Sequence, residues 1–263
     1  MQNPSLIVGW SEDAGKLGSK VVDYLTQKLP AKELAEMEPT SFFPLGEVVV
    51  EDDVAMFPTS KLYCCPEKNL VIFKSSLPRS QWHKFLNAVL DVVGNYGHLS
   101  EVYTIGSMVS LSAHTVPRQL LAVVNSTEIK RALRKYEIVG NMNYETPPGQ
   151  RPTLSSFLLW VAKRRNTPAA SLWVPIPFYL VSTEDPWACR RALEFLDQRL
   201  NLRLDFRDLD EEVERQAAKI AQARSHSPHV DAGIRKLENN EGVTHDESER
   251  LIREIEEFLK QKD

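Results

Sequence analysis

The chain has 263 residues, 42% of them hydrophobic, which is enough for a sizeable core in one large or two modest domains. The formal net charge is -4, so no general electrostatic attraction to nucleic acid or to an anionic membrane is expected. Three cysteines do not make a disulfide framework in a chain of this size. The first residues carry no secretory signal, and no apolar run approaches the roughly 20 residues of a membrane span. We therefore expect a cytoplasmic protein.

Short apolar runs alternate with helical periodicities along the first 176 residues. The runs predict strands at 6–10, 70–73, 101–105, 120–124 and 171–176, and the periodicities predict helices at 17–28, 81–93 and 153–163. The runs LIV, LVIF and LLAVV are almost wholly apolar, which is typical of strands buried on both faces of a parallel sheet. Strands that alternate with helices of this length predict an α/β sandwich.

The later part of the chain reads as helical. Asp185 precedes a proline at the first position of one predicted helix, and a further helix starts at about Asp208. The segment RSHSPHV, at 224–230, has the composition of a linker. We therefore divide the chain into an α/β domain at 1–223 and, at 224–263, a linker with a C-terminal helical extension.

The last predicted helix is amphipathic. Thr244 and Glu247 have the spacing of a capping box, in which each residue satisfies a backbone amide at the helix start. Apolar side chains then recur at helical spacing on one face: Leu251, Ile252, Ile255, Phe258 and Leu259. This face must pack on the domain, on a partner chain or on a second copy, and we treat it as a candidate interaction helix.

The loop after the first strand, GWSEDAGKLG, resembles a phosphate-binding turn only superficially. Gly9 and Gly15 enclose five residues instead of four, and Leu17 stands where a Walker A loop needs Ser or Thr. Two carboxylates, Glu12 and Asp13, would also repel a phosphate. The glycines therefore predict a tight strand-to-helix turn, with Asp13 as the cap of the helix.

The segment GSMVSLSAH follows a predicted strand and is the best place to look for catalysis. Loops at the carboxyl ends of strands hold ligands in open α/β folds. The segment offers Ser107 and His114, but it lacks the G-x-S-x-G elbow of an α/β hydrolase and a nearby acid. We assign no catalytic residue, and we take five side chains of the strand-end loops as a candidate ligand pocket: Trp10, Asp13, Gly15, Ser107 and His114.

Other clusters of polar residues have ordinary explanations. Cys64 and Cys65 are adjacent and read as reduced thiols, and His226, His229 and His245 lack the pattern of a metal site. The basic runs KRALRK, at 130–135, and KRR, at 163–165, carry no interleaved aromatic residues. Such runs usually mark solvated helix faces, so we expect no metal, no cofactor and no nucleic-acid partner.

Several segments, in order along nearly the whole chain, resemble the PAC2 family of proteasome assembly chaperones and their archaeal and bacterial relatives. They are GWSEDAGKLGSKVVDYL (9–25), FPTSKLYCC (57–65), LVIF (70–73), VYTIGSM (102–108), TLSSFLLWVAKRRNTPAASLWVPIPFYL (153–180), DPWACRRALEFLDQRL (185–200) and EIEEFLKQ (254–261). The resemblance implies a three-layer α/β/α domain, similar to the nucleoside phosphorylase/hydrolase fold, with a C-terminal helical extension. It also implies self-association and the binding of other proteins, among them proteasome α-subunits, rather than catalysis.

Two hypotheses follow. The first is a non-enzymatic assembly factor that binds its partners, or its own copies, through apolar faces. Archaeal relatives that contact the proteasome end in a hydrophobic-Tyr-any-residue tail, whereas this sequence ends FLKQKD and lacks that tyrosine. The alternative is an enzyme of the nucleosidase or phosphorylase type, suggested by the implied fold, with Asp13, Ser107 and His114 as its candidate polar groups.

Overall fold

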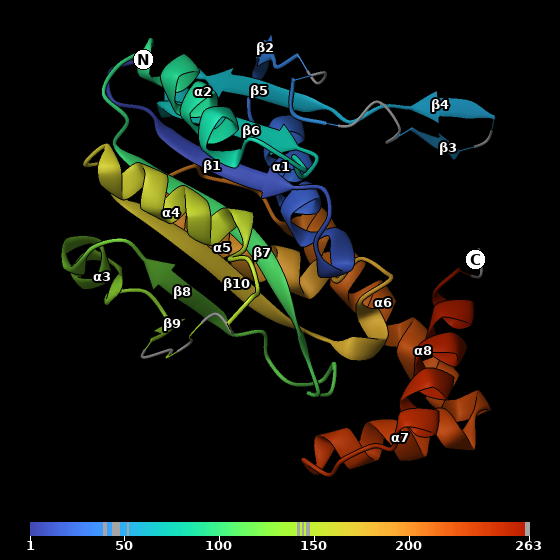
Figure 1. The fold of residues 1–263 in the computed structure, drawn as a ribbon. Helices are drawn as coiled ribbons and strands as arrows, with labels where there is room; N and C mark the ends of the chain where they lie inside the picture. Colours follow the sequence, from blue (N-terminus) through green and yellow to red (C-terminus); the bar gives the residue numbers. More distant parts are fainter. Residues whose placement is uncertain are drawn as a thin grey trace.

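The computed structural model describes residues 1–38, 41–43, 48–51, 53–140, 143, 145 and 148–260 (Figure 1). Residues 261–263, and with them the end of the FLKQKD segment, lie outside this set. The strands are β1 Ser5–Trp10, β2 Lys32–Glu36, β3 Val49–Glu51, β4 Val54–Met56, β5 Ser60–Cys65, β6 Leu70–Ser75, β7 Glu101–Ser110, β8 Leu120–Val124, β9 Ile138–Val139 and β10 Ala169–Pro177. The helices are α1 Leu17–Lys28, α2 Trp82–Gly94, α3 Thr127–Leu133, α4 Leu154–Arg164, α5 Pro186–Leu200, α6 Arg207–His226, α7 Pro228–Glu238 and α8 His245–Lys260, with short 3-10 turns η1 Ala14–Lys16, η3 Pro66–Lys68 and η4 Phe178–Leu180.

Eight strands form one mixed sheet in the order β2-β5-β6-β1-β7-β10-β8-β9. The four central strands, β6, β1, β7 and β10, are parallel, as their apolar sequences predict. The prediction was wrong for LLAVV, because β8 runs antiparallel to β10 and is partly exposed. The partial exposure follows from its place near the sheet edge, where the short strand β9 pairs with only two of its residues.

Helices cover both faces of the sheet and give the predicted three-layer α/β/α sandwich. On one face α1 and α5 bury side chains such as Leu25 and Leu193 against the strands. On the other face α2 and α4 do the same with side chains such as Phe85 and Leu158, and Figure 1 shows these two helices side by side over the sheet. The small hairpin β3–β4 forms a separate two-stranded sheet that projects from the body.

Glycine allows β1 and α1 to approach each other closely. A Cβ atom at Gly9 would lie 2.2 Å from the Gly18 carbonyl oxygen and 2.6 Å from a Val22 methyl group. Gly15 lies in the same connection and has a φ of +63°, which glycine adopts without strain. The prediction that glycines shape the turn is confirmed for Gly15, whereas Gly9 is needed for the contact between strand and helix.

The C-terminal helices pack on one another and on the end of the sheet. The linker predicted at 224–230 is helical on both sides of Ser227, because α6 ends at His226 and α7 begins at Pro228. The Ser227 hydroxyl accepts the Val230 N–H and caps α7, so the Ser-Pro pair starts a helix instead of an open linker. His226 therefore stands at a helix end, with its ring beside that of Phe258.

The capping box of α8 is confirmed. The Thr244 N–H donates to Glu247 Oε2 at 2.9 Å, and the Glu247 N–H donates to Thr244 Oγ1 at 3.3 Å. The apolar stripe that follows packs within this chain: Leu251 and Ile255 are buried with residues of η4, α6 and α7. A role for the stripe as an interaction surface therefore stays a prediction for its half-buried end alone, at Phe258 and Leu259.

Candidate functional site

The carboxyl ends of two adjacent parallel strands bring Asp13 and Ser107 together. Asp13 lies in the turn after β1, and Ser107 lies on β7, which pairs directly with β1. The Ser107 hydroxyl donates to Asp13 Oδ2 at 3.3 Å and also lies against the Ala14 carbonyl oxygen. The predicted strand ended at Ile105, but β7 continues to Ser110, so Ser107 belongs to the strand instead of a loop.

The Asp13 carboxylate also caps α1, although from outside the helix. Its oxygens accept the Gly18 N–H at 3.2 and 3.3 Å, whereas Lys16 holds the N-cap position. Burial raises the pKa of Asp13 to about 6, and the hydrogen bonds from Gly18 and Ser107 oppose that rise. Asp13 thus titrates near neutral pH, as a general acid or base would. Its oxygens, however, already accept hydrogen bonds from Gly18 and Ser107.

Trp10 and Gly15 both form hydrogen bonds within the chain. The Trp10 indole is buried and donates to Ser155 Oγ at 2.9 Å, which joins β1 to the start of α4. The Gly15 N–H donates to the Val181 carbonyl oxygen at 2.8 Å. None of five surface hollows found on the described part of the chain is lined by Trp10, Asp13, Gly15, Ser107 or His114.

His114 belongs to a different cluster. Its backbone N–H donates to the Tyr179 hydroxyl at 2.6 Å, and its Nδ1 lies 2.9 Å from the same oxygen. Burial and the nearby Arg118 and Arg224 guanidinium groups lower the pKa of His114 to about 4, so the ring is neutral at pH 7. Among the described residues no hydrogen bond joins His114 to Asp13 or Ser107, and the structure therefore assembles only part of the predicted pocket.

A buried ion pair holds this second cluster to α5, and the sequence reading missed it. The Arg118 Nε donates to Asp185 Oδ2 at 2.9 Å, with both side chains almost fully buried. The other Asp185 oxygen accepts the Ala188 N–H, which confirms Asp185 as the N-cap of α5. Arg118 and Asp185 are 67 positions apart in the sequence, and no local pattern links them.

The most distinctive surface near the site is an apolar one. Beyond Ser107 the side chains of Met108, Val109 and Leu111 are exposed, by 54% at Val109 and 70% at Leu111, and Val116 follows in the same connection. We call these four residues the β7 tip. The sequence reading missed it because it treated the segment as a catalytic loop, although three large apolar residues among serines were already visible.

Metal and membrane sites find no support in the described structure. No group of three or more His, Cys, Asp and Glu side chains is placed to hold a metal ion within the described residues, and Cys64, Cys65 and Cys189 are free thiols. Across the same residues, no helix is both long enough and apolar enough to cross a membrane.

The fold defines the class of protein: a three-layer α/β/α sandwich with an exposed apolar tip on β7 and packed C-terminal helices. The chain belongs to the PAC2 family, whose family model matches residues 6–224. A search of curated protein sequences found no match.

Solved structures of similar fold come from bacteria and archaea. The Mycobacterium tuberculosis protein Rv2714, of unknown function, is 20% identical with a TM-score of 0.77, over 91% of this chain and 82% of that one. Rv2125 of the same organism, a proteasome-assembly chaperone homologue, is 18% identical with a TM-score of 0.69, over 83% and 94%. The Pyrococcus furiosus protein PbaB, an archaeal proteasome activator, is 20% identical with a TM-score of 0.68, over 85% and 94%.

Proposed function

We propose that this protein is a non-enzymatic assembly factor that acts by binding other proteins, as its PAC2 membership suggests. The observation that carries the proposal is the β7 tip, where a strand of the central sheet ends in exposed apolar side chains. Large apolar side chains left exposed near one strand end are candidates for a protein-protein contact. The similar structures suggest the proteasome as the partner, because two of those proteins are named for proteasome assembly or activation. Within the proteasome, the α-type subunits are the partners that the family resemblance implies.

Self-association belongs to the same proposal. A second copy would cover the tip of the first, since exposed apolar side chains suit the centre of an interface. The packed stripe of α8 is a weaker candidate for this contact, because Ile255 is fully buried in its own chain.

The experiment is an affinity capture from the native lysate with three tagged forms of the protein, read by mass spectrometry. The test variant is Val109→Asp with Leu111→Asp, and the matched control is Tyr96→Asp, an exposed aromatic residue outside the tip. We expect the wild type and the control to retain proteasome α-type subunits and the test variant to lose them. Light scattering of the same three proteins would show whether the tip also holds copies together. Equal capture by all three proteins would rule out the tip as the binding surface.

The enzyme alternative rests on one observation, the raised pKa of Asp13 beside the Ser107 hydroxyl. General acid-base catalysis needs such a group within reach of a substrate. Nucleoside turnover, assayed with and without phosphate, tests this alternative. Activity that Asp13→Asn abolishes would favour the enzyme over the assembly factor.

A further inference from the structure

The largest of the five hollows described above lies at the opposite end of the sheet from β2, away from Asp13 and the β7 tip. Its volume is about 900 Å³, and it is lined by residues of β8, the adjoining turn, α3, β9 and the end of α4. This volume lies within the range of ordinary ligand-binding clefts, roughly 300–1,000 Å³. Nothing in the proposed function uses this surface.

The floor of the hollow is strand β8, which the described residues pair only in part on its outer side. On one side β8 pairs with β10 along Leu121 to Val124, whereas on the other side β9 pairs only with Leu120 and Leu121. The Asn125 N–H donates to the Ala169 carbonyl oxygen at 3.1 Å, toward β10. Backbone groups alternate in direction along an antiparallel strand, so those of Val124 point the opposite way, toward the open edge. Among the described residues, no strand pairs with Val123 or Val124 on this side.

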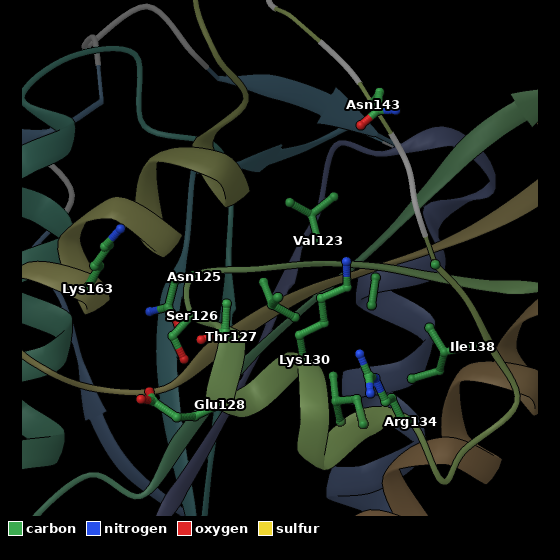
Figure 2. Close-up of a pocket in the computed structure, with 14 residues that line it drawn as sticks. Val123, Asn125, Ser126, Thr127, Glu128, Lys130, Arg134, Ile138, Asn143 and Lys163 are labelled. Atoms are coloured by element: carbon green, nitrogen blue, oxygen red, sulfur yellow. The ribbon is translucent and has the colours of Figure 1, made fainter.

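Positive charge surrounds this edge. Lys130 lies on α3, Arg134 follows the last residue of α3, and Lys163 lies on α4. Figure 2 shows Lys163 across the hollow from the other two. Glu128 is the one carboxylate among the lining residues. None of the three cations forms a salt bridge with a carboxylate of the described chain. The hollow is therefore cationic in a protein whose net charge is -4.

The two basic runs of the sequence thus have a common place in the fold. Separately, KRALRK and KRR looked like solvated helix faces, because 30 or so positions of chain divide them. The sheet brings one member of each run, Lys130 and Lys163, to the same open strand. Apolar side chains lie between the charges, with Val123 exposed by 40%.

We propose that this hollow binds an extended acidic peptide segment of a partner protein, which adds to the sheet as a strand beside β8. Main-chain hydrogen bonds to an open edge give affinity in this mode of recognition, and side-chain pockets give specificity. The carboxylates of the segment would face Lys130, Arg134 and Lys163, and its apolar side chains would cover Val123. A small anion would use the cations but would leave the strand edge unpaired, so a peptide fits more of the observed features.

The test is fluorescence anisotropy with a labelled peptide of roughly six residues, the usual length of a strand, that alternates glutamate and valine. The test variant is Lys130→Glu with Lys163→Glu. The control is Arg131→Glu with Arg164→Glu, which reverses the neighbouring charges on the same two helices outside the hollow. We expect the wild type and the control to bind, and the test variant to bind about tenfold more weakly or worse, with binding that falls as salt rises.

A second peptide separates strand addition from simple charge attraction. It has the same sequence but carries N-methyl groups on alternate residues, so that one of its two edges cannot donate hydrogen bonds. Two versions are made, and each blocks the edge that the other leaves free. Strand addition predicts that one of the two methylated versions loses binding. Equal binding of both versions, equal binding to the two charge-reversed variants, or no binding to the wild type would each overturn the proposal. Circular dichroism confirms that both variants fold.

Discussion

Asp13 is a residue of the candidate site whose pKa departs clearly from its ordinary value. Burial raises its pKa from 3.8 to about 6, so the folded chain holds a proton that the unfolded chain has already released. The protonated form stabilises the fold fully below pH 4, and this contribution is lost as the pH rises through about 6. Above that pH the Asp13 carboxylate is charged, and its burial costs free energy even though it accepts the Gly18 N–H.

We therefore predict that the free energy of unfolding contributed by Asp13 falls by about 2.4 kcal/mol between pH 4 and pH 7. Asp13→Asn should remove most of this slope, because the amide does not titrate and can still accept a hydrogen bond. Urea denaturation of both proteins at several pH values in this range measures the difference. The exposed Glu257→Gln serves as the control and should leave the slope unchanged. Parallel pH profiles for wild type and Asp13→Asn would contradict the prediction.

At this scale the sequence predicted some neighbours and missed others. Asp13 and Ser107 were both chosen because they follow or end strands, and parallel strands do bring such residues together. His114 was chosen for its nearness in sequence to Ser107, but the chain turns away after β7 and places it against Tyr179. The Arg118–Asp185 pair could not be foreseen, because only the packed loops bring those two residues within reach.

The limits of each helix depend on its capping residues, and the direction of each strand depends on its place in the sheet. The predicted helices formed close to their expected limits, since apolar periodicity and capping residues are local signals. The direction of β8 was not a local property, because LLAVV suits a parallel or an antiparallel neighbour equally well. Its partner β10 lies about 50 residues away along the chain, and the connection between them decides the direction.

We predict that Gly9→Ala disrupts the contact between β1 and α1. The added methyl group would meet the Gly18 backbone at 2.2 Å, so the strand and helix would have to separate, at a cost of more than about 4 kcal/mol. Gly94→Ala is the matched control at the end of α2, where an added Cβ meets nothing within 4 Å. This change should raise stability by about 0.5 kcal/mol.

Thermal and urea denaturation of the purified proteins distinguish these outcomes, and soluble yield replaces them if Gly9→Ala does not fold. A Gly9→Ala protein with wild-type stability would show that β1 and α1 can separate without loss of packing.

Across the whole molecule, the C-terminal helices share a core with the end of the sheet. Phe178, Tyr179 and Leu180 follow β10 directly and are buried among residues of α6, α7 and α8. In addition, α6 reaches both cores, with Leu209 in the sheet-covering layer and Ile220 in the C-terminal cluster. The division into two domains at 223/224 therefore remains a proposal. The helices after this boundary cover apolar side chains that precede it in the chain.

We predict a single cooperative unfolding transition for the full chain. Ile255→Ala, in the centre of the C-terminal cluster, should lower the stability of the whole protein by about 2–5 kcal/mol without splitting this transition. Ile252→Ala on the half-buried side of α8 is the control and should cost less. Calorimetry together with tryptophan fluorescence measures both. Two separate transitions, with only one affected by Ile255→Ala, would indicate that the C-terminal helices fold as an independent unit.

The sequence by itself determined the α/β class, the positions of most helices and central strands, the capping box of α8 and the resemblance to the PAC2 family. These features depend on apolar periodicity and on residues a few positions apart, and such relations are present in the chain before it folds. Tertiary structure alone decided that the α8 stripe is covered by its own chain and that Asp13 meets Ser107 but not His114. It also decided that Lys130 and Lys163 flank the same open strand. Each of these outcomes depends on which distant segments the sheet places side by side, and no local pattern encodes that choice.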